Sequence, residues 1–194
     1  MRLSDQDIEG WLDSGLLKIT PRPDKKHIHG VTVDIKLGNK FRVFQKKNAH
    51  VINLNGKKQE IQQVLDRMMS PEMTLLNTEF FALKPGSFVL SLTKEMIILP
   101  SFLVGWLDGR SSLARLGLMV HATSHRIDPG WIGYIVLEIY NLGEMTLLLQ
   151  PGMLIGAISF ESLSSKSIRP YNIRSSAKYW NQDSVVISKI GKDI

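Results

Sequence analysis

The chain has 194 residues, of which 43% are hydrophobic and 22% charged, proportions typical of a globular protein rather than a disordered one. Its formal charge of +6 suits nucleic acid, a membrane surface or a phosphate-bearing small molecule and does not choose among them. The chain has no cysteine, which excludes the zinc-dependent nucleobase deaminases with their P-C-x-x-C motif. No apolar run reaches the ~18 residues of a membrane helix, and the acidic N-terminal stretch is unlike a signal peptide, so we expect a cytoplasmic protein.

Two stretches have the spacing of amphipathic helices. Near the N-terminus, Ser4 is a candidate helix cap with Asp7 three residues later, and the apolar face that follows can end at Gly15. A second helix is expected over Lys57–Met69, because apolar residues recur there at helical spacing until Pro71. We expect both helices to pack against the core rather than to bind a partner.

Most of the remaining chain has the pattern of short strands, β-branched or aromatic and separated by turn residues. The expected strands are Val31–Ile35, Lys40–Phe44, Glu79–Leu83, Ser87–Thr93, Gly117–Thr123, Gly133–Tyr140, Met145–Leu149 and Leu154–Phe160. Pro-Gly dipeptides at Pro85, Pro129 and Pro151 mark turns, and regular turns of this kind are typical of a sandwich or barrel.

The chain is long enough for one domain with a small appendage. We expect a β domain over residues 1–168 and a mobile C-terminal arm over residues 169–194, where the sequence is polar, basic and aromatic without a core-facing period. Such an arm could bind nucleic acid, remain solvated, or close as a flap on a phosphorylated ligand.

One carboxylate lies in a hydrophobic strand. Alternation along the strand places Glu138 on the same face as Tyr134 and Val136, with Ile135 and Ile139 on the other. Burial would raise the pKa of Glu138 and a nearby arginine would lower it, so that the balance could suit proton transfer near neutral pH. A structural ion pair is the alternative, and the sequence leaves it open.

The turn over residues 109–115 combines two arginines with two serines. If it opens a helix, Ser111, Ser112, the backbone N–H groups and the Arg110 guanidinium would form an anion site, although capping alone would also explain the serines. Arg115 could join this site or reach Glu138. The turn lacks the P-loop pattern G-x-x-x-x-G-K-[ST].

His121 and His125 have the spacing of a metal pair, but a zincin would need Glu where the chain has Ala122. Structural histidines are therefore favoured, and we expect no metal site. Ser111, His125 and Asp128 lack the context of a nucleophile elbow, so the sequence gives no support to a serine hydrolase.

Several motifs in the same order closely resemble the bacterial dCTP deaminases, members of the trimeric dUTPase-like superfamily. They are GWLDGRSSLARLGLMVH, HRIDPGW, IVLE, MRLSDQDIEGWLD, VDIKLGNKFRVF, LQPGMLIGAISFE and RPYN…AKYWNQ, and together they cover essentially the whole chain. The resemblance implies a mainly β fold, a distorted antiparallel β barrel with a few peripheral helices. It also implies a homotrimer with active sites between subunits, and hydrolytic deamination of dCTP to dUTP and ammonia without zinc, which would feed dUMP and thymidylate synthesis.

The resemblance also implies roles for individual residues. Glu138 would be the general base and acid, with Ser111 and Arg115 as catalytic partners from across the subunit boundary. The catalytic set further includes Ser124, whose backbone carbonyl would help to place the water and which stands where the family often has Ala. The implied substrate-binding residues are Arg110, Ser111, Ser112, Leu113, Ala114 and Arg115 at the triphosphate, Asp128 at the sugar, Val136, Leu137 and Glu138 along the base, and Tyr171, Lys178 and Gln182 in the closing tail.

The same resemblance implies Mg²⁺ carried by the substrate phosphates rather than by dedicated protein ligands. It makes dTTP an expected feedback inhibitor, and it implies neither a nucleic acid nor a membrane as partner. Ile132 and Tyr134 replace the smaller residues that we expect beside the Asp-Pro-Gly-Trp turn.

Three alternatives remain. A bifunctional relative would deaminate dCTP and also release dUMP and pyrophosphate. A plain dUTPase is less favoured, since it has no use for a water-activating carboxylate at the amino group. A nucleic-acid-binding β-barrel module would bind DNA in a salt-sensitive way, but the chain has no stripe of stacking aromatic residues.

Overall fold

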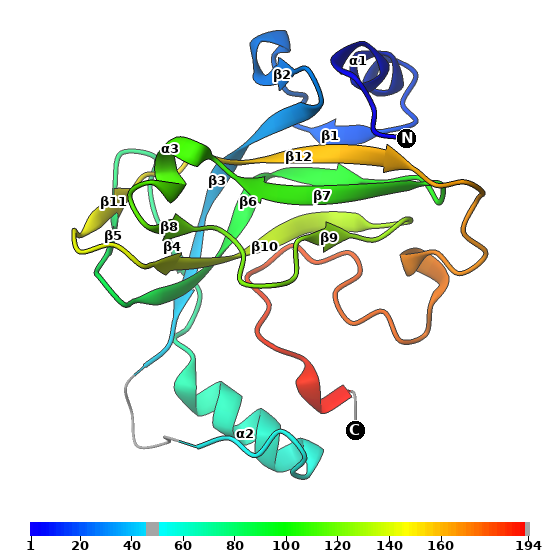
Figure 1. Ribbon diagram of the computed structural model, residues 1–194. Helices are drawn as coiled ribbons and strands as arrows, with labels where there is room; N and C mark the ends of the chain where they lie inside the picture. The colour runs from blue at the N-terminus through cyan, green and yellow to red at the C-terminus, as the bar shows by residue number, and fades with distance from the viewer. Residues whose placement is uncertain (46–50, 193–194) are drawn as a thin grey trace.

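The computed structural model describes residues 1–45 and 51–192 (Figure 1). Within these ranges, strands from the whole length of the chain form a curled antiparallel sheet in the order β8-β10-β6-β3-β12-β7-β9, with β1, β2 and β4 at its margins. The sheet is an open half-barrel, with α1 and β2 above it and α2 below it in Figure 1. The expectation of a mainly β, antiparallel fold with peripheral helices is confirmed.

The helices are α1 (Asp5–Asp13), α2 (Lys58–Met68) and α3 (Ser111–Ala114), with 3₁₀ turns η1 (Lys25–His27), η2 (Tyr171–Ile173) and η3 (Ile190–Lys192). The strands are β1 (Lys18–Thr20), β2 (Ile28–His29), β3 (Thr32–Val43), β4 (Met73–Thr74), β5 (Phe81–Leu83), β6 (Phe88–Ile98), β7 (Leu103–Gly109), β8 (Leu118–Met119), β9 (Arg126–Ile127), β10 (Ile132–Asn141), β11 (Leu147–Leu149) and β12 (Leu154–Ser162). In the described ranges no helix is long and apolar enough to cross a membrane.

Both expected helices are present. The Ser4 hydroxyl accepts a hydrogen bond from the backbone N–H of Asp7, whose carboxylate accepts one from the Ser4 N–H, so a capping box begins α1. Along α2, the side chains of Ile61 and Leu65 are buried while the polar residues face solvent. The apolar side of α1 thus packs in the core through Ile8 and Leu12, whereas α2 contacts η3 of the tail.

Several expected strand boundaries were wrong. Instead of two strands, a single strand β3 runs through Gly38, which lies between the two expected strands. A Cβ at Gly38 would lie 2.9 Å from the carbonyl oxygen of Leu92, so this glycine permits close approach of β6 rather than a turn. The strand expected over residues 117–123 reduces to β8, because the chain after Met119 leaves the sheet.

The sequence pattern did not reveal β1, β2, β4, β7 and β9. Four of these strands have two or three residues, too few for an alternating pattern to stand out. The seven-residue β7 contains two glycines and a tryptophan, and its turn-like composition concealed a strand that pairs with both β12 and β9.

The C-terminal tail packs against the domain, contrary to the expectation that none of it faces the core. Val185 is fully buried, and Gln182 forms an isolated parallel bridge with Gly133 of β10. In Figure 1 the tail passes below β9 and β10 and ends beside α2, where η3 contacts that helix. The division at residue 168 stays a prediction.

Candidate active site

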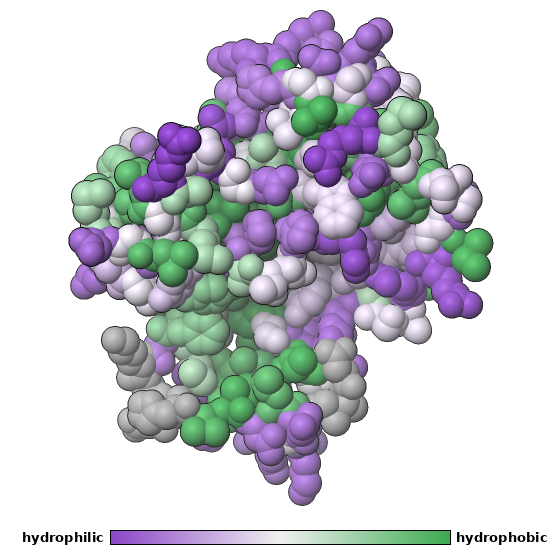
Figure 2. Space-filling model, viewed as in Figure 1, coloured by the Kyte–Doolittle hydropathy of each residue, from purple (hydrophilic) through white to green (hydrophobic). Residues whose placement is uncertain are grey.

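A cavity of about 700 Å³ lies between β10, the segment 123–128, the end of α2 and the tail. Six of the residues proposed from the sequence line it: Ser124, Asp128, Val136, Glu138, Tyr171 and Gln182. Its other end is apolar, with Leu65, Met69 and Phe88 among its walls. Figure 2 shows apolar residues gathered in this lower part of the molecule, around α2. The cavity therefore has a polar end and an apolar end, as pockets for small organic ligands commonly do.

Glu138 extends from the cavity-facing side of β10. Burial alternates along this strand, and Glu138 is half-buried between the buried Leu137 and Ile139. The backbone N–H of Ala122 donates a hydrogen bond to its Oε2 at 2.9 Å. Among the described residues no donor reaches Oε1, and no cation forms an ion pair with the carboxylate. The structural ion pair left open by the sequence is thus absent from the described part of this chain.

Two histidines lie next to this carboxylate. The rings of His121 and His125 are 5.3 Å apart between centroids, and His125 also contacts the ring of Trp106 at 5.3 Å. Burial lowers the pKa of His121, as does the neighbouring His125, while the charges of Asp108 and Glu138 oppose this shift. His121 is therefore biased toward its neutral form, and its buried Nδ1 has no hydrogen-bond partner among the described residues.

Asp128 joins the body of the protein to the tail. Its Oδ1 accepts a hydrogen bond from Arg126 at 2.8 Å, and its Oδ2 accepts one from Arg174 of the tail at 2.6 Å. The Arg174 guanidinium also lies 4.8 Å from the centroid of the Tyr171 ring, which in turn packs on Trp131. The tail is thereby fixed at the Asp-Pro-Gly-Trp turn, beside the candidate sugar contact.

The amide of Gln182 presents an unused acceptor beside the cavity. Its Nε2 donates to the carbonyl oxygen of Tyr134 at 2.8 Å, which fixes the orientation of the amide because that carbonyl can only accept. Gln182 is 7% exposed, and its Oε1 is buried without a partner among the described residues. A buried acceptor of this kind favours a ligand that brings a donor.

The turn with two arginines opens the short helix α3. Its N-cap is Arg110, whose side chain makes no capping hydrogen bond, so capping does not account for Ser111 and Ser112. Both serines and Arg115 are exposed, whereas Arg110 is half-buried and forms an ion pair with Asp34 of β3. The hydroxyls and the Arg115 guanidinium therefore remain open to a ligand or to another chain.

The structure does not bring every proposed residue to the cavity. Ser111 and Arg115 do not line it, and the rest of the turn lies with them in α3 and its cap. The Leu137 side chain is fully buried in the core on the opposite face of β10, so only its backbone could meet a ligand. Lys178 is half-buried in the tail, and its carbonyl accepts a hydrogen bond from Lys189.

Sequence reasoning missed the cavity residues Trp131, His125 and Tyr179 as lining groups. Their signal was weak because aromatic residues are equally common in ordinary cores. The sequence also did not reveal Asp34 as the ion-pair partner of Arg110. Its only signal was its position as an acid among the valines and isoleucines of a strand.

A family model described as dCTP deaminase-like matches residues 2–163, which is most of the chain. The chain belongs to the dCTP deaminase-like family. The match contains α3, Asp128 and Glu138 and ends just after β12, so the tail residues at the cavity lie outside it.

A solved structure shows a similar fold for this member of the dCTP deaminase-like family. The 2'-deoxycytidine 5'-triphosphate deaminase from Agrobacterium tumefaciens superposes with a TM-score of 0.61 at 20% identity, over 82% of this chain and 46% of that one. This chain thus spans a little under half the length of that protein. The EIAV dUTPase gives a TM-score of 0.41 at 22% identity, over 54% of this chain and 84% of that one. A dUTPase from phage phi11 of S. aureus gives 0.40 at 16%, over 49% and 78%.

Proposed function

We propose that this protein catalyses the hydrolytic deamination of dCTP to dUTP and ammonia, and so feeds dUMP and thymidylate synthesis. The observation that carries the proposal is the Glu138 carboxylate, which lines a cavity of about 700 Å³ in a chain of the dCTP deaminase-like family. The Ala122 N–H holds one carboxylate oxygen and leaves the other for a water molecule. A carboxylate so positioned can act as a general base and then as a general acid.

In the proposed reaction, Glu138 takes a proton from water as the water oxygen forms a bond to C4 of the cytosine. The carboxyl group gives this proton to N3 of the ring. It then transfers the second proton of the former water from the new hydroxyl to the amino group, the C4–N bond breaks, and ammonia leaves. Each assisted proton transfer is typically worth ~10²–10⁴-fold in rate. Placing the water beside Glu138, with the Ser124 backbone as an expected partner, supplies a further part through positioning.

The cavity supports an amino-bearing pyrimidine as the substrate. The free Oε1 of Gln182 can accept a hydrogen bond from the exocyclic amine of cytosine, whereas the corresponding oxygen of uracil would place two acceptors against each other. A buried unpaired acceptor typically costs about 1–3 kcal/mol, which is enough to discriminate between the two bases. Asp128 would contact the sugar, while Val136 and the backbone of Leu137 run along the base.

The exposed turn supports recognition of the triphosphate. Arg110, Ser111, Ser112 and Arg115 offer guanidinium and hydroxyl donors. The N–H groups of Leu113 and Ala114 donate to the Arg110 carbonyl, so these two residues would contribute through the shape of the turn. Mg²⁺ would enter with the phosphates, because no group of three or more His, Asp or Glu side chains suited to a metal occurs in the described ranges. Tyr171, Lys178 and Gln182 would close the tail over the nucleotide.

Ser111 and Arg115 lie outside the cavity that Glu138 lines, and we propose that they complete the active site of a neighbouring subunit in a homotrimer. Their exposure in the single chain supports this arrangement. Because dTTP carries the same triphosphate and deoxyribose, we also propose that it competes with dCTP and can act as a feedback inhibitor.

The proposal is tested by measuring ammonia release from dCTP, CTP and dCMP side by side. We expect turnover of dCTP, with much slower release from CTP and dCMP. A pyrophosphate assay on the dCTP reaction tests the bifunctional alternative, since pyrophosphate formed in step with ammonia would establish it. Turnover of dUTP but not of dCTP would contradict deamination altogether.

A further inference from the structure

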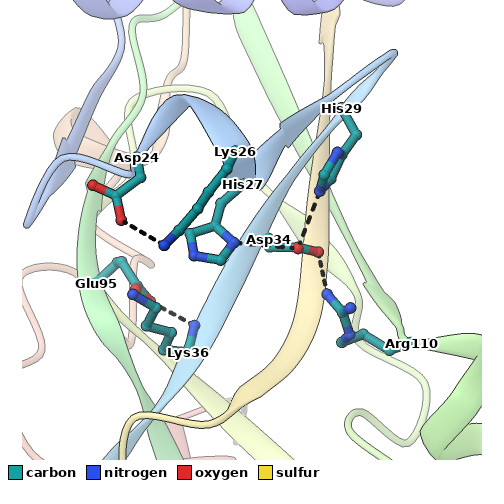
Figure 3. Close-up of polar contacts among 8 residues, drawn as sticks. All are labelled: Asp24, Lys26, His27, His29, Asp34, Lys36, Glu95 and Arg110. Atoms are coloured by element: carbon teal, nitrogen blue, oxygen red, sulfur yellow. Dashed lines mark hydrogen bonds and ion pairs between the residues drawn. The ribbon is translucent and has the colours of Figure 1, made fainter.

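Arg110, a residue of the proposed triphosphate turn, is tethered to a carboxylate on a different strand. Its Nη1 donates to Oδ1 of Asp34, and the side chain of Asp34 is only 8% exposed while that of Arg110 is 31% exposed (Figure 3). Asp34 is 76 residues away along the chain and does not line the cavity. Only the fold brings the two residues together.

The strand register explains how they meet. Across β12, Ala157 is directly opposite Asp34 on one side and Asp108 on the other. Opposite residues in antiparallel strands point to the same face, and Arg110 follows Asp108 by two positions at the end of β7, so its side chain starts from that face. Alanine at position 157 leaves room for the Arg110 side chain to cross β12.

The second oxygen of Asp34 is held from another direction. Oδ2 lies 3.3 Å from Nε2 of His29 and 3.7 Å from Nδ1 of His27, both from the η1–β2 segment that covers this face (Figure 3). Contacts on Oδ2 restrict rotation of the carboxylate, and Oδ1 is thereby kept toward Arg110. The carboxylate is a fixed anchor rather than a mobile surface charge.

We infer that Asp34 is a positioning residue for nucleotide binding, which it supports by holding the Arg110 guanidinium ready for the triphosphate. The inference rests on the proposed function. A free arginine loses several rotatable torsions when it binds, whereas a guanidinium tethered at Nη1 has already lost them and keeps its other N–H donors for phosphate oxygens.

The sign of the effect separates positioning from simple electrostatics. Asp34 is an acid close to a site for an anion, so removal of its charge alone should strengthen triphosphate binding. Positioning predicts the reverse, because Asp34→Asn keeps the shape of the side chain but weakens the charge-assisted contact with Arg110.

The experiment measures the Kd of dCTP with Mg²⁺ by calorimetry, in the full chain carrying Glu138→Gln so that substrate is not consumed. We expect Asp34→Asn to raise the Kd about tenfold, the equivalent of one charge-assisted hydrogen bond. Arg110→Ala should raise it as well, and adding Asp34→Asn to Arg110→Ala should not raise the Kd any further. The matched control is Asp108→Asn, an exposed acid on the same face, which should leave the Kd unchanged or lower it.

A second variant tests the inference without changing either charged residue. Ala157→Leu keeps both charged groups but fills the path between them, and it should raise the Kd in the same way. If Asp34→Asn does not fold, Ala157→Leu decides, and an unchanged Kd there overturns the inference.

The outcomes also separate this inference from the proposed function. If the Glu138→Gln chain binds dCTP and Asp34→Asn binds it equally well or more tightly, only the inference is overturned. The inference is likewise overturned if the effects of Asp34→Asn and Arg110→Ala add in full, as a general loss of structure would require. If the Glu138→Gln chain binds no dCTP, both proposals are overturned.

Discussion

Glu138 and Glu95 both lie in apolar strands of this protein, and their surroundings give them different properties. Glu138 on β10 is half-buried at the cavity, with one oxygen held by a backbone N–H. Glu95 on β6 is 4% exposed and does not line the cavity. Burial raises the pKa of Glu95, although a hydrogen bond from the Lys36 N–H at 2.9 Å opposes the shift (Figure 3). Glu95 is thus buried at a cost to stability, while Glu138 lines the cavity.

Replacing Glu138 by Gln should abolish turnover while preserving binding. The amide keeps the size of the side chain and can accept the hydrogen bond from Ala122, but it cannot shuttle protons. We expect ammonia release to fall by at least about 10²-fold, the lower end for a lost proton-transfer group, with little change in the Kd of dCTP. Single-turnover assays and calorimetry on the same preparation measure the two effects. Substantial residual activity would place the base elsewhere.

Glu95 gives a prediction about stability and pH. Below the ordinary glutamate pKa of about 4.3, both the folded and the unfolded chain are protonated at this position, so burial carries no charge penalty. As the pH rises through the interval up to the raised folded pKa, the unfolded chain loses its proton first, and the wild type loses stability. The penalty is fully present once the pH exceeds the raised folded pKa.

Glu95→Gln should therefore raise the Tm at neutral pH, by about 2–4 °C for each kcal/mol of penalty removed. The difference from the wild type should shrink as the pH falls toward 4, and thermal unfolding across a pH series measures it. A variant that is less stable at neutral pH would show that the charged form of Glu95 is favoured by its surroundings.

At the scale of elements, the Asp-Pro-Gly-Trp turn is where the tail packs against the domain. Gly130 has a φ of +79°, and a Cβ there would lie 2.6 Å from Oδ1 of Asn172 and 2.8 Å from the side chain of Pro170. The Tyr171 N–H also donates to the Pro129 carbonyl at 2.7 Å. The turn thus requires glycine both for its backbone conformation and for contact with the tail.

Gly130→Ala should release the tail. We expect faster tryptic cleavage after Arg169 and Arg174 and a higher Kd for dCTP, because Arg174 would no longer be held at Asp128. Limited proteolysis followed by mass spectrometry measures the first effect, and calorimetry the second.

Gly152→Ala is the matched control. Gly152 has a similar φ of +86°, but nothing lies within 4 Å of a Cβ placed there. Gly152→Ala should lower the stability of the protein only by the backbone strain of about 1–2 kcal/mol, without exposing the tail. Equal protease sensitivity in the two variants would mean that the tail does not depend on the turn.

At the scale of the whole molecule, the proposed catalytic residues fall into two groups. Glu138 lines the cavity, whereas Ser111 and Arg115 are exposed on and beside α3. If the groups meet between subunits, each site needs Glu138 from one chain and Arg115 from its neighbour.

This arrangement predicts complementation between two inactive variants. Glu138→Gln and Arg115→Ala should each be nearly inactive alone. After unfolding and refolding together, random mixing should restore about a quarter of the wild-type activity, because one interface in four then combines two intact halves. Ammonia release from the mixture measures this, and light scattering gives the number of subunits. A mixture as inactive as its components would contradict a shared site.

The sequence by itself determined the class of the fold and named the residues that we propose for the chemistry. Local rules suffice for the capping box at Ser4, the stripe along α2 and the alternation on β10, because each involves residues a few positions apart. The same alternation put Glu138 on the accessible face of its strand. The motifs also named Asp128 and Gln182 as candidate site residues. They did not predict the cavity that these two residues line.

Tertiary structure decided what local spacing leaves undetermined. Gly38 lies between two expected strands, yet β3 continues through it, with an irregularity in its pairing with β6 between Leu37 and Phe41. Strand pairing on both sides of Gly38 outweighs its low local propensity. The register of three strands brings Asp34 and Arg110 together. The tail packs closely against the turn at Gly130. These contacts join residues far apart in the chain, whose approach depends on how all the intervening strands pair, and no short stretch of sequence contains that information.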